Sequence, residues 1–245
     1  MPVKLPVYIL TLADAAERRQ PLVDALDEMG IPFTLWHGVE GRRGLPADYA
    51  HMIDRAAARK KLRREMGDGE FACALSHHLI YRDIVEKSHP LALVLEDDAR
   101  ITPDLRNFLA QLDRDDFDLV LLDHQNARII ENERLQFPSG QIAYRVIVQP
   151  YLTSAYIVTR QGAVALVEGS LPITAPADWP FDISHLRTYA IDPRMVRQQG
   201  GSLPSYLNHE RPNQPLRRVR PPAARFLTAA YWRKKFRKLR SRRIS

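Results

Sequence analysis

Apolar residues near the N-terminus form two short blocks, and a longer amphipathic stretch separates them. The run Val7–Leu12 is apolar at nearly every position, which is typical of a buried strand. Asp14 and Glu17 have the spacing of a capping box, so we expect a helix from there to about Met29. Phe33–Trp36 is a second apolar block. A strand, a helix and a strand in this order predict a β-α-β unit, whose two strands run parallel.

The same alternation continues to about residue 170 and predicts a three-layer α/β sandwich, with a sheet between two layers of helices. Farther on, prolines at 172, 176, 180, 193 and 204 make the pattern too weak to predict an element. The predicted strands are Leu91–Leu95, Phe117–Leu122, Ile142–Val148 and Thr153–Val158. The predicted helices are His51–Met66, Glu70–Lys87, one that begins at Pro103 with Thr102 as its N-cap, and one that begins near Gln161.

The C-terminal end differs from the rest of the chain in charge. Residues 211–245 contain 13 of the 36 Lys and Arg residues and none of the 29 Asp and Glu residues. Residues 1–210 therefore hold 23 basic and 29 acidic residues, a net charge of −6, although the whole chain carries +7. We divide the chain accordingly into a folded body, residues 1–210, and a basic linker with a tail, residues 211–245.

In the tail, Trp232, Phe236 and Leu239 share one face of a predicted basic amphipathic helix. Such a helix is expected to bind an anionic membrane surface, and a disordered solubilising tail is the alternative. No run approaches the roughly 20 apolar residues of a membrane span. The first residues lack the features of an export signal, and the single cysteine, Cys73, fits a reducing compartment and is interpreted as a small buried residue. We expect a cytoplasmic protein, peripherally attached to the inner membrane.

The strongest chemical signal is the acid triplet Glu96, Asp97 and Asp98, which follows the apolar run Leu91–Leu95. Ligands of open α/β sheets bind beyond the carboxyl ends of the strands. Three adjacent carboxylates repel one another unless a cation neutralises them. Hard oxygen ligands suit Mg²⁺ or Mn²⁺, which in turn can hold a diphosphate. A solvated acidic loop in which Asp97 or Asp98 caps a turn is the alternative.

Two further clusters are weaker signals. Ser76 and His77 lie on a predicted helix, where His77 can ligate a metal, hydrogen-bond a sugar or satisfy a buried carbonyl. Asp178 and Asp182 flank Trp179 in a proline-rich loop. An aromatic ring that stacks on a sugar, beside carboxylates that bind hydroxyls or accept a proton, is what a saccharide site needs. An ordinary surface turn has a similar composition.

Taken together, these pieces resemble glycosyltransferase family 25, the lipopolysaccharide and lipooligosaccharide biosynthesis transferases. The resemblance covers roughly residues 5 to 200 and consists of several blocks in the family's order. The blocks are Val7–Leu12 with Glu17–Arg19, Gly30–Phe33 with Val39–Gly41, Gly69–His77, Leu93–Asp98, Thr153–Ala163 and Pro176–Trp179. The most specific feature is the Ser-His helix some twenty residues before the acid triplet.

The resemblance implies a Rossmann-like body of the GT-A type in residues 1–210, which transfers a hexose from UDP-galactose or UDP-glucose to a lipopolysaccharide core saccharide. It makes Glu96, Asp97 and Asp98 the counterpart of that fold's Asp-x-Asp metal motif. We expect Asp98 to hold Mn²⁺ or Mg²⁺, with Glu96, or alternatively Asp97, beside it. In an inverting reaction the acceptor hydroxyl needs a base, for which Asp178 is the candidate and Asp182 the reserve. The residues expected to bind the donor are Thr11, Leu12, Arg18, Glu40, Ser76, His77, Glu96 and Asp97.

Two other classes remain open from the residues alone. A metal-dependent phosphoester hydrolase also uses carboxylates at strand ends. A non-catalytic nucleic-acid-binding protein would use the basic tail, but the body is acidic and the tail has few interleaved aromatic residues, so we expect no nucleic-acid partner.

Overall fold

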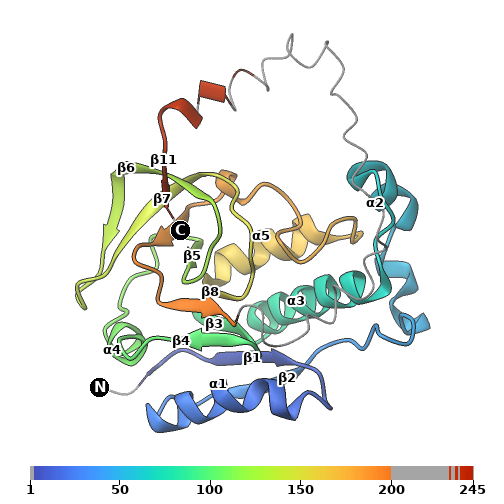
Figure 1. Cartoon of the computed structure of the whole chain (residues 1–245), viewed down its shortest axis with the longest axis horizontal. Helices are drawn as coiled ribbons and strands as arrows, with labels where there is room; N and C mark the ends of the chain where they lie inside the picture. The colour runs from blue at the N-terminus through green and yellow to red at the C-terminus, as the bar shows by residue number, and fades with distance from the viewer. Residues whose placement is uncertain (1–2, 200–231, 233–234, 237, 245) are drawn as a thin grey trace.

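The β-α-β unit predicted at the N-terminus is present and forms one end of a large sheet (Figure 1). The computed structural model describes residues 3–199, 232, 235–236 and 238–244. The helices are α1 (Ala16–Glu28), α2 (Arg55–Leu62), α3 (Asp68–Glu86), α4 (Leu105–Ala110) and α5 (Arg160–Ser170), with the 3₁₀ helices η1 (Ala47–Met52) and η2 (Ile183–His185). The strands are β1 (Val7–Thr11), β2 (Thr34–His37), β3 (Leu91–Glu96), β4 (Ala99–Ile101), β5 (Leu119–Leu121), β6 (Ala127–Gln136), β7 (Ile142–Val148), β8 (Ala155–Thr159), β9 (Thr188–Ile191), β10 (Val196–Gln198) and β11 (Arg242–Ile244).

The main sheet is mixed. Strand β1 lies between β2 and β3 and is parallel to both, with Tyr8 opposite Thr34 on one side and Val94 on the other. The order of the described strands is β11-β6-β7-β9-β5-β8-β3-β1-β2, and β8 runs antiparallel between β3 and β5. Because β2, β1 and β3 run in one direction, their carboxyl ends meet at one edge of the sheet.

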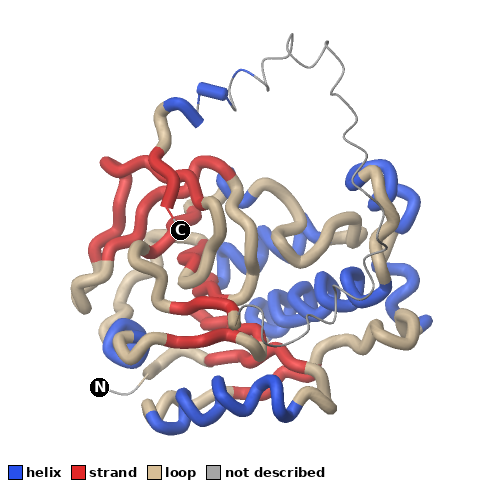
Figure 2. The backbone as a smooth tube through the Cα atoms, viewed as in Figure 1, coloured by secondary structure: helices blue, strands red, loops and turns tan. Residues whose placement is uncertain are grey.

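Hydrophobic side chains pack on both faces of this sheet. Ile9 belongs to a buried cluster that includes Leu26 of α1, whereas Tyr8, its neighbour in sequence, belongs to a second cluster with Ile80 of α3 and Leu166 of α5. Successive side chains of a strand point to opposite faces, and each such burial contributes about 1.5–3 kcal/mol. The strands therefore run between two helical layers, which Figure 2 shows by colour, and the predicted three-layer arrangement is confirmed.

The first predicted helix start is wrong in detail. Helix α1 has Ala15 as its N-cap, with no side-chain hydrogen bond, so Asp14 and Glu17 do not form the expected capping box. Asp14 instead pairs with Arg42, 2.8 Å away, across the loop that follows β2. A long-range ion pair has therefore replaced the local cap.

Two other predicted helices also differ from the structure. Thr102 is not an N-cap, because α4 begins at Leu105 after the short strand β4 pairs with β10. The stretch predicted as one helix over residues 51–66 is divided into η1 and α2. The reason is the Asp54 side chain, which accepts a hydrogen bond of 2.8 Å from the Ala57 N–H and so begins α2 afresh.

Five strands were not predicted from the sequence: β4, β6, β9, β10 and β11. Strands β6 and β7 form an antiparallel pair with two register irregularities. Strands β9 and β10 lie in the proline-rich stretch where no element was predicted. All five are short or partly exposed, so their apolar patterns are weak.

The chain returns to the sheet near its C-terminus. Strand β11 pairs with β6, Ile244 is buried there, and Arg242 forms a 2.7 Å ion pair with Glu131. The linker and part of the predicted basic amphipathic helix lie outside the described residues, so the division at residue 210 stays a prediction. No helix in the described part of the chain has the length and apolar character needed to cross a bilayer.

Candidate functional site

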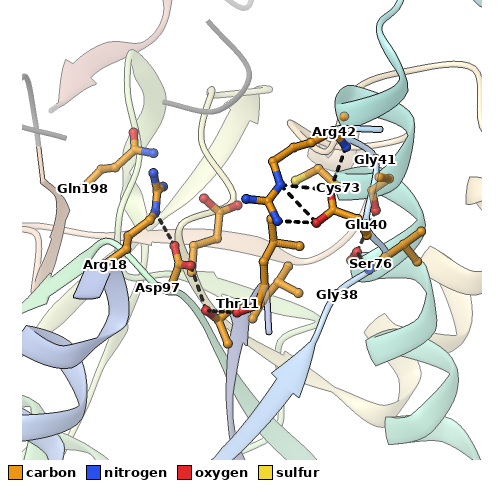
Figure 3. A pocket seen from close by; sticks show the side chains of 16 residues that line it. Thr11, Arg18, Gly38, Glu40, Gly41, Arg42, Cys73, Ser76, Asp97 and Gln198 are labelled. Carbon is orange, nitrogen blue, oxygen red and sulfur yellow. Dashed lines mark hydrogen bonds and ion pairs between the residues drawn. The ribbon is translucent and has the colours of Figure 1, made fainter. Parts of the chain in front are cut away.

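A cleft opens at the sheet edge where β1, β2 and β3 end. Its empty volume is about 780 Å³, counting the space open to solvent. Strand ends and α1 form one wall, and the first half of α3 forms the other (Figure 3). Of the predicted site residues, those that line the cleft are Thr11, Leu12, Arg18, Glu40, Ser76, Glu96 and Asp97.

The acid triplet lies at this edge and is bound to Arg18. The Arg18 guanidinium donates from Nε to Asp97 Oδ1 at 2.6 Å and from Nη2 to Asp98 Oδ2 at 2.7 Å. Thr11 donates a 2.9 Å hydrogen bond to the second oxygen of Asp97. Asp97 and Asp98 are 8% and 6% exposed, so the alternative of a solvated acidic loop does not fit the structure.

One guanidinium does not balance three carboxylates. Burial, together with the charge of Glu96, raises the pKa of Asp98 to about 6 even though Arg18 is bound to it. Burial also raises the pKa of Asp97. Burial opposes ionisation of Glu96 as well, but hydrogen bonds from His77 and Thr153 outweigh it and the pKa of Glu96 is lowered. With all three acids ionised, Arg18 leaves two negative charges, which favours a divalent cation.

The donor chemistry of these residues fits Mg²⁺ or Mn²⁺. Asp98 Oδ1 is buried and has no hydrogen-bond partner among the described residues. A buried carboxylate oxygen without a partner costs about 1–3 kcal/mol or more, and a hard cation would satisfy it. Glu96 lines the cleft, and Asp98 lies two residues farther along the chain without lining it. Asp98 and Glu96 are therefore the residues of this triplet that could hold such an ion.

Helix α3 holds the loop that follows β2. Ser76 Oγ accepts a 2.8 Å hydrogen bond from the Val39 N–H and donates one of 2.7 Å to the Ala72 carbonyl. A Cβ on Gly41 would lie 2.6 Å from the Asp68 carbonyl oxygen, so only glycine lets the loop come this close. Ser76 therefore shapes the cleft through the backbone.

His77 is fully buried behind the cleft and does not line it. Its Nε2 lies 3.1 Å from Glu96 Oε1 and its Nδ1 lies 2.9 Å from Tyr156 Oη. Thr153 donates a 3.0 Å hydrogen bond to the same oxygen of Glu96. The described partners of His77 are thus a hydroxyl and a carboxylate and not a buried carbonyl, and its predicted roles as a metal ligand or a sugar-binding residue stay predictions.

Glu40 lies at the mouth of the cleft. Its carboxylate is hydrogen-bonded to the Arg42 side chain, which lowers the pKa of Glu40. Arg42 also donates to both carboxylate oxygens of Asp14, at 2.8 Å each. Arg42 and Gln198 line the cleft but were not predicted, and for Gln198 the sequence carries no signal.

The two candidate bases differ in their surroundings. Asp182 is exposed and caps η2 through a 3.1 Å hydrogen bond from the Ser184 N–H. Asp178 accepts a 3.2 Å hydrogen bond from the Leu152 N–H. Its negative charge is one of those that raise the pKa of Cys73, a residue that lines the cleft. Neither aspartate lines the cleft itself, but Asp178 is the one close to it.

Comparison with known proteins identifies the family. The model of glycosyltransferase family 25 (LPS biosynthesis protein) matches residues 4–181. The chain is 25% identical over 214 residues to the lacto-N-neotetraose biosynthesis glycosyltransferase LgtE of Neisseria meningitidis serogroup B, covering 78% of this chain and 73% of that protein.

Two animal proteins match a shorter part. A glycosyltransferase 25 family member of Aedes aegypti is 29% identical over 171 residues, and procollagen galactosyltransferase 1-B of Xenopus laevis is 27% identical over 171 residues. Each match covers 66% of this chain but only 28% of the relative, so this chain spans about a quarter of their length. The family match extends from the first strand to the loop of Asp178 and includes the whole acid triplet. The chain therefore belongs to glycosyltransferase family 25.

Proposed function

We propose that this protein transfers a hexose, galactose or glucose, from a UDP-sugar to a core saccharide of lipopolysaccharide or lipooligosaccharide, with inversion and with Mn²⁺ or Mg²⁺. The observation that carries the proposal is the cleft at the carboxyl ends of β1, β2 and β3, with buried carboxylates and Arg18 on its wall. Nucleotides bind at this edge of open α/β sheets. A Rossmann-like body of the GT-A type is the fold that we propose on the same basis.

Three of the proposed site residues would stabilise the leaving nucleotide diphosphate, and one would act on the acceptor. Asp98 and Glu96 would hold the divalent ion, which stabilises the negative charge on the leaving nucleotide diphosphate. Arg18 already donates two hydrogen bonds to carboxylate oxygens, and diphosphate oxygens can accept the same bonds. Asp178 is the proposed base that takes the proton of the acceptor hydroxyl.

A donor screen tests this proposal. We expect the purified protein with Mn²⁺ and truncated lipopolysaccharide to transfer sugar from UDP-galactose or UDP-glucose and not from GDP- or CMP-sugars. Product formed on the lipid is measured by mass spectrometry, and a reaction with excess chelator is the control. Free phosphate released from the nucleotide substrate without sugar transfer would instead support a phosphoester hydrolase, and a preference for GDP- or CMP-sugars would contradict the proposed donor.

We also propose that the tail attaches this cytoplasmic enzyme to the anionic surface of the inner membrane, where its lipid-linked acceptor lies. Trp232, Phe236 and Leu239 are 44%, 58% and 72% exposed. The first two rings are 6.3 Å apart, and Lys235 lies 4.9 Å from the Trp232 ring. Apolar rings beside cations suit a headgroup region, where each basic residue contributes about 1 kcal/mol.

Vesicle flotation tests the tail. The triple variant Trp232→Ala, Phe236→Ala, Leu239→Ala is preferable to a truncation, because strand β11 follows and belongs to the sheet. We expect the unchanged protein to float with phosphatidylglycerol vesicles and the variant to remain at the bottom, with zwitterionic vesicles as the control. Equal flotation of the two proteins would rule out this attachment.

A further inference from the structure

Three side chains of different chemistry meet where α3 faces the end of β3. They are Cys73, His77 and Glu96, whose ligand atoms all lie within 4.8 Å of one another. The first two are four residues apart and therefore lie on one face of the helix. Cys73 and Glu96 line the cleft, and His77 lies behind them. Figure 3 shows Cys73 on the α3 wall of the cleft.

The spacing of these atoms suits one metal ion. In a tetrahedral zinc site with bonds of about 2.0–2.3 Å, the ligand atoms are about 3.3–3.8 Å apart. His77 Nε2 and Glu96 Oε1 are 3.1 Å apart, already close to that separation. Cys73 Sγ lies at most 4.8 Å from each of the other two ligand atoms. A movement of the sulfur by about 1 Å, which a rotation of the Cys73 side chain can supply, would bring all three atoms to the separation of a zinc site.

The surrounding residues hold two of the three ligands in place. Tyr156 Oη lies 2.9 Å from His77 Nδ1, the ring nitrogen that faces away from Glu96. Thr153 donates to Glu96 Oε1, and both partners of that carboxylate are buried. Ligating histidines and carboxylates in metal sites are typically oriented by such outer hydrogen bonds.

We propose that Cys73 Sγ, His77 Nε2 and Glu96 Oε1 bind one Zn²⁺ at the wall of the cleft. One sulfur, one nitrogen and one oxygen ligand favour this borderline-soft ion over Mg²⁺ or Mn²⁺. Zinc replaces the thiol proton, which is released to solvent. The His77 proton resides on Nδ1, and Tyr156 Oη accepts a hydrogen bond from this N–H. Three protein ligands leave a fourth position, for water or an oxygen of a substrate.

This site goes beyond the proposed function, whose hard cation is expected at Asp98. Glu96 would use a different oxygen in each site. Oε1, on which its described hydrogen bonds with His77 and Thr153 lie, would bind zinc, and the other oxygen would bind the hard cation. The two proposals can therefore fail separately. Zinc binding requires Cys73 and not Asp98, whereas sugar transfer with Mn²⁺ requires Asp98.

Cobalt absorption spectroscopy on the purified full chain tests the site. After removal of metals, Co²⁺ is expected to produce a thiolate-to-cobalt absorption band at one equivalent, and Zn²⁺ to displace it. Asp98→Asn should keep the band and Cys73→Ser should lose it. Tyr156→Phe keeps the buried ring but removes the hydroxyl beside His77, and we expect it to weaken zinc binding about 10–100-fold.

Thermal melting without metal shows whether each variant is folded. If Cys73→Ser does not fold, Tyr156→Phe still tests the site. The proposal is overturned if the unchanged protein gives no thiolate band. It is equally overturned if folded Cys73→Ser binds Zn²⁺ with unchanged affinity and stoichiometry. If Cys73→Ser does not fold, the same result for Tyr156→Phe overturns it.

Discussion

Asp98→Asn is expected to lower the rate of sugar transfer about 10²–10³-fold. The substitution keeps the shape of the side chain but removes the negative charge that would hold the divalent ion, and losing one preorganised electrostatic group at a reacting centre typically costs that much. The hydrogen bonds from Arg18 and Gln198 can be kept, because both end on Asp98 Oδ2, an atom that the asparagine carbonyl can replace. The measurement is the initial rate of product formation with saturating donor across a Mn²⁺ titration.

The same substitution is expected to make the protein more stable, by about 1–2 kcal/mol at neutral pH. Folding raises the pKa of Asp98 from 3.8 to about 6, so the folded state binds more protons than the unfolded state between these values. The free energy of unfolding of the unchanged protein therefore falls as the pH rises through this window. Two pKa units correspond to about 3 kcal/mol, and the buried amide hydrogens of asparagine offset part of it.

Urea denaturation at several pH values measures this difference. We expect Asp98→Asn to exceed the unchanged protein in stability above pH 6 and the two to converge near pH 4. Asp115→Asn, the same chemical change at an exposed position away from the cleft, is the control and should alter neither rate nor stability. Full transfer activity in Asp98→Asn would end the metal-site proposal, and lower stability at neutral pH would contradict the charge argument.

The sequence predicted the parts of the fold that are buried on both faces. Strands β1, β3, β5 and β8 are apolar except for the last residue of β1, β3 and β8, and every or nearly every position is buried, so composition alone identifies them. Strand β6, residues Ala127–Gln136, has charged side chains at several exposed positions, and its pairing with β7 is irregular. Such a strand is stabilised by its neighbours and not by its own pattern, so the sequence does not reveal it.

The site was predictable to a similar extent. The carboxyl ends of neighbouring parallel strands must meet, which places Thr11 near Asp97 although they are 86 positions apart. Nothing in the sequence shows that Arg18 binds two of the acids, or that Gln198 reaches Asp98 across 100 positions. Those contacts depend on the packing of α1 and on β10, a strand that follows from tertiary pairing with β4. From the sequence, Cys73 is expected only to be a small buried residue, because its neighbours His77 and Glu96 form a group with it only after folding.

Gly162→Ala is expected to destabilise the protein by about 3 kcal/mol or more, against the helix preference for alanine, which alone would stabilise it by about 1 kcal/mol. Gly162 lies in the first turn of α5, and a Cβ there would be 2.3 Å from the Asp118 carbonyl oxygen and 3.2 Å from a Val158 methyl carbon. Backbone cannot rotate away as a side chain can, so α5 must move off the sheet and lose part of the packing of Leu166. Chemical denaturation measures the effect, with Glu168→Ala on the exposed face of α5 as the near-neutral control. A Gly162→Ala protein at least as stable as the unchanged one would show that α5 does not pack this closely against the start of β5.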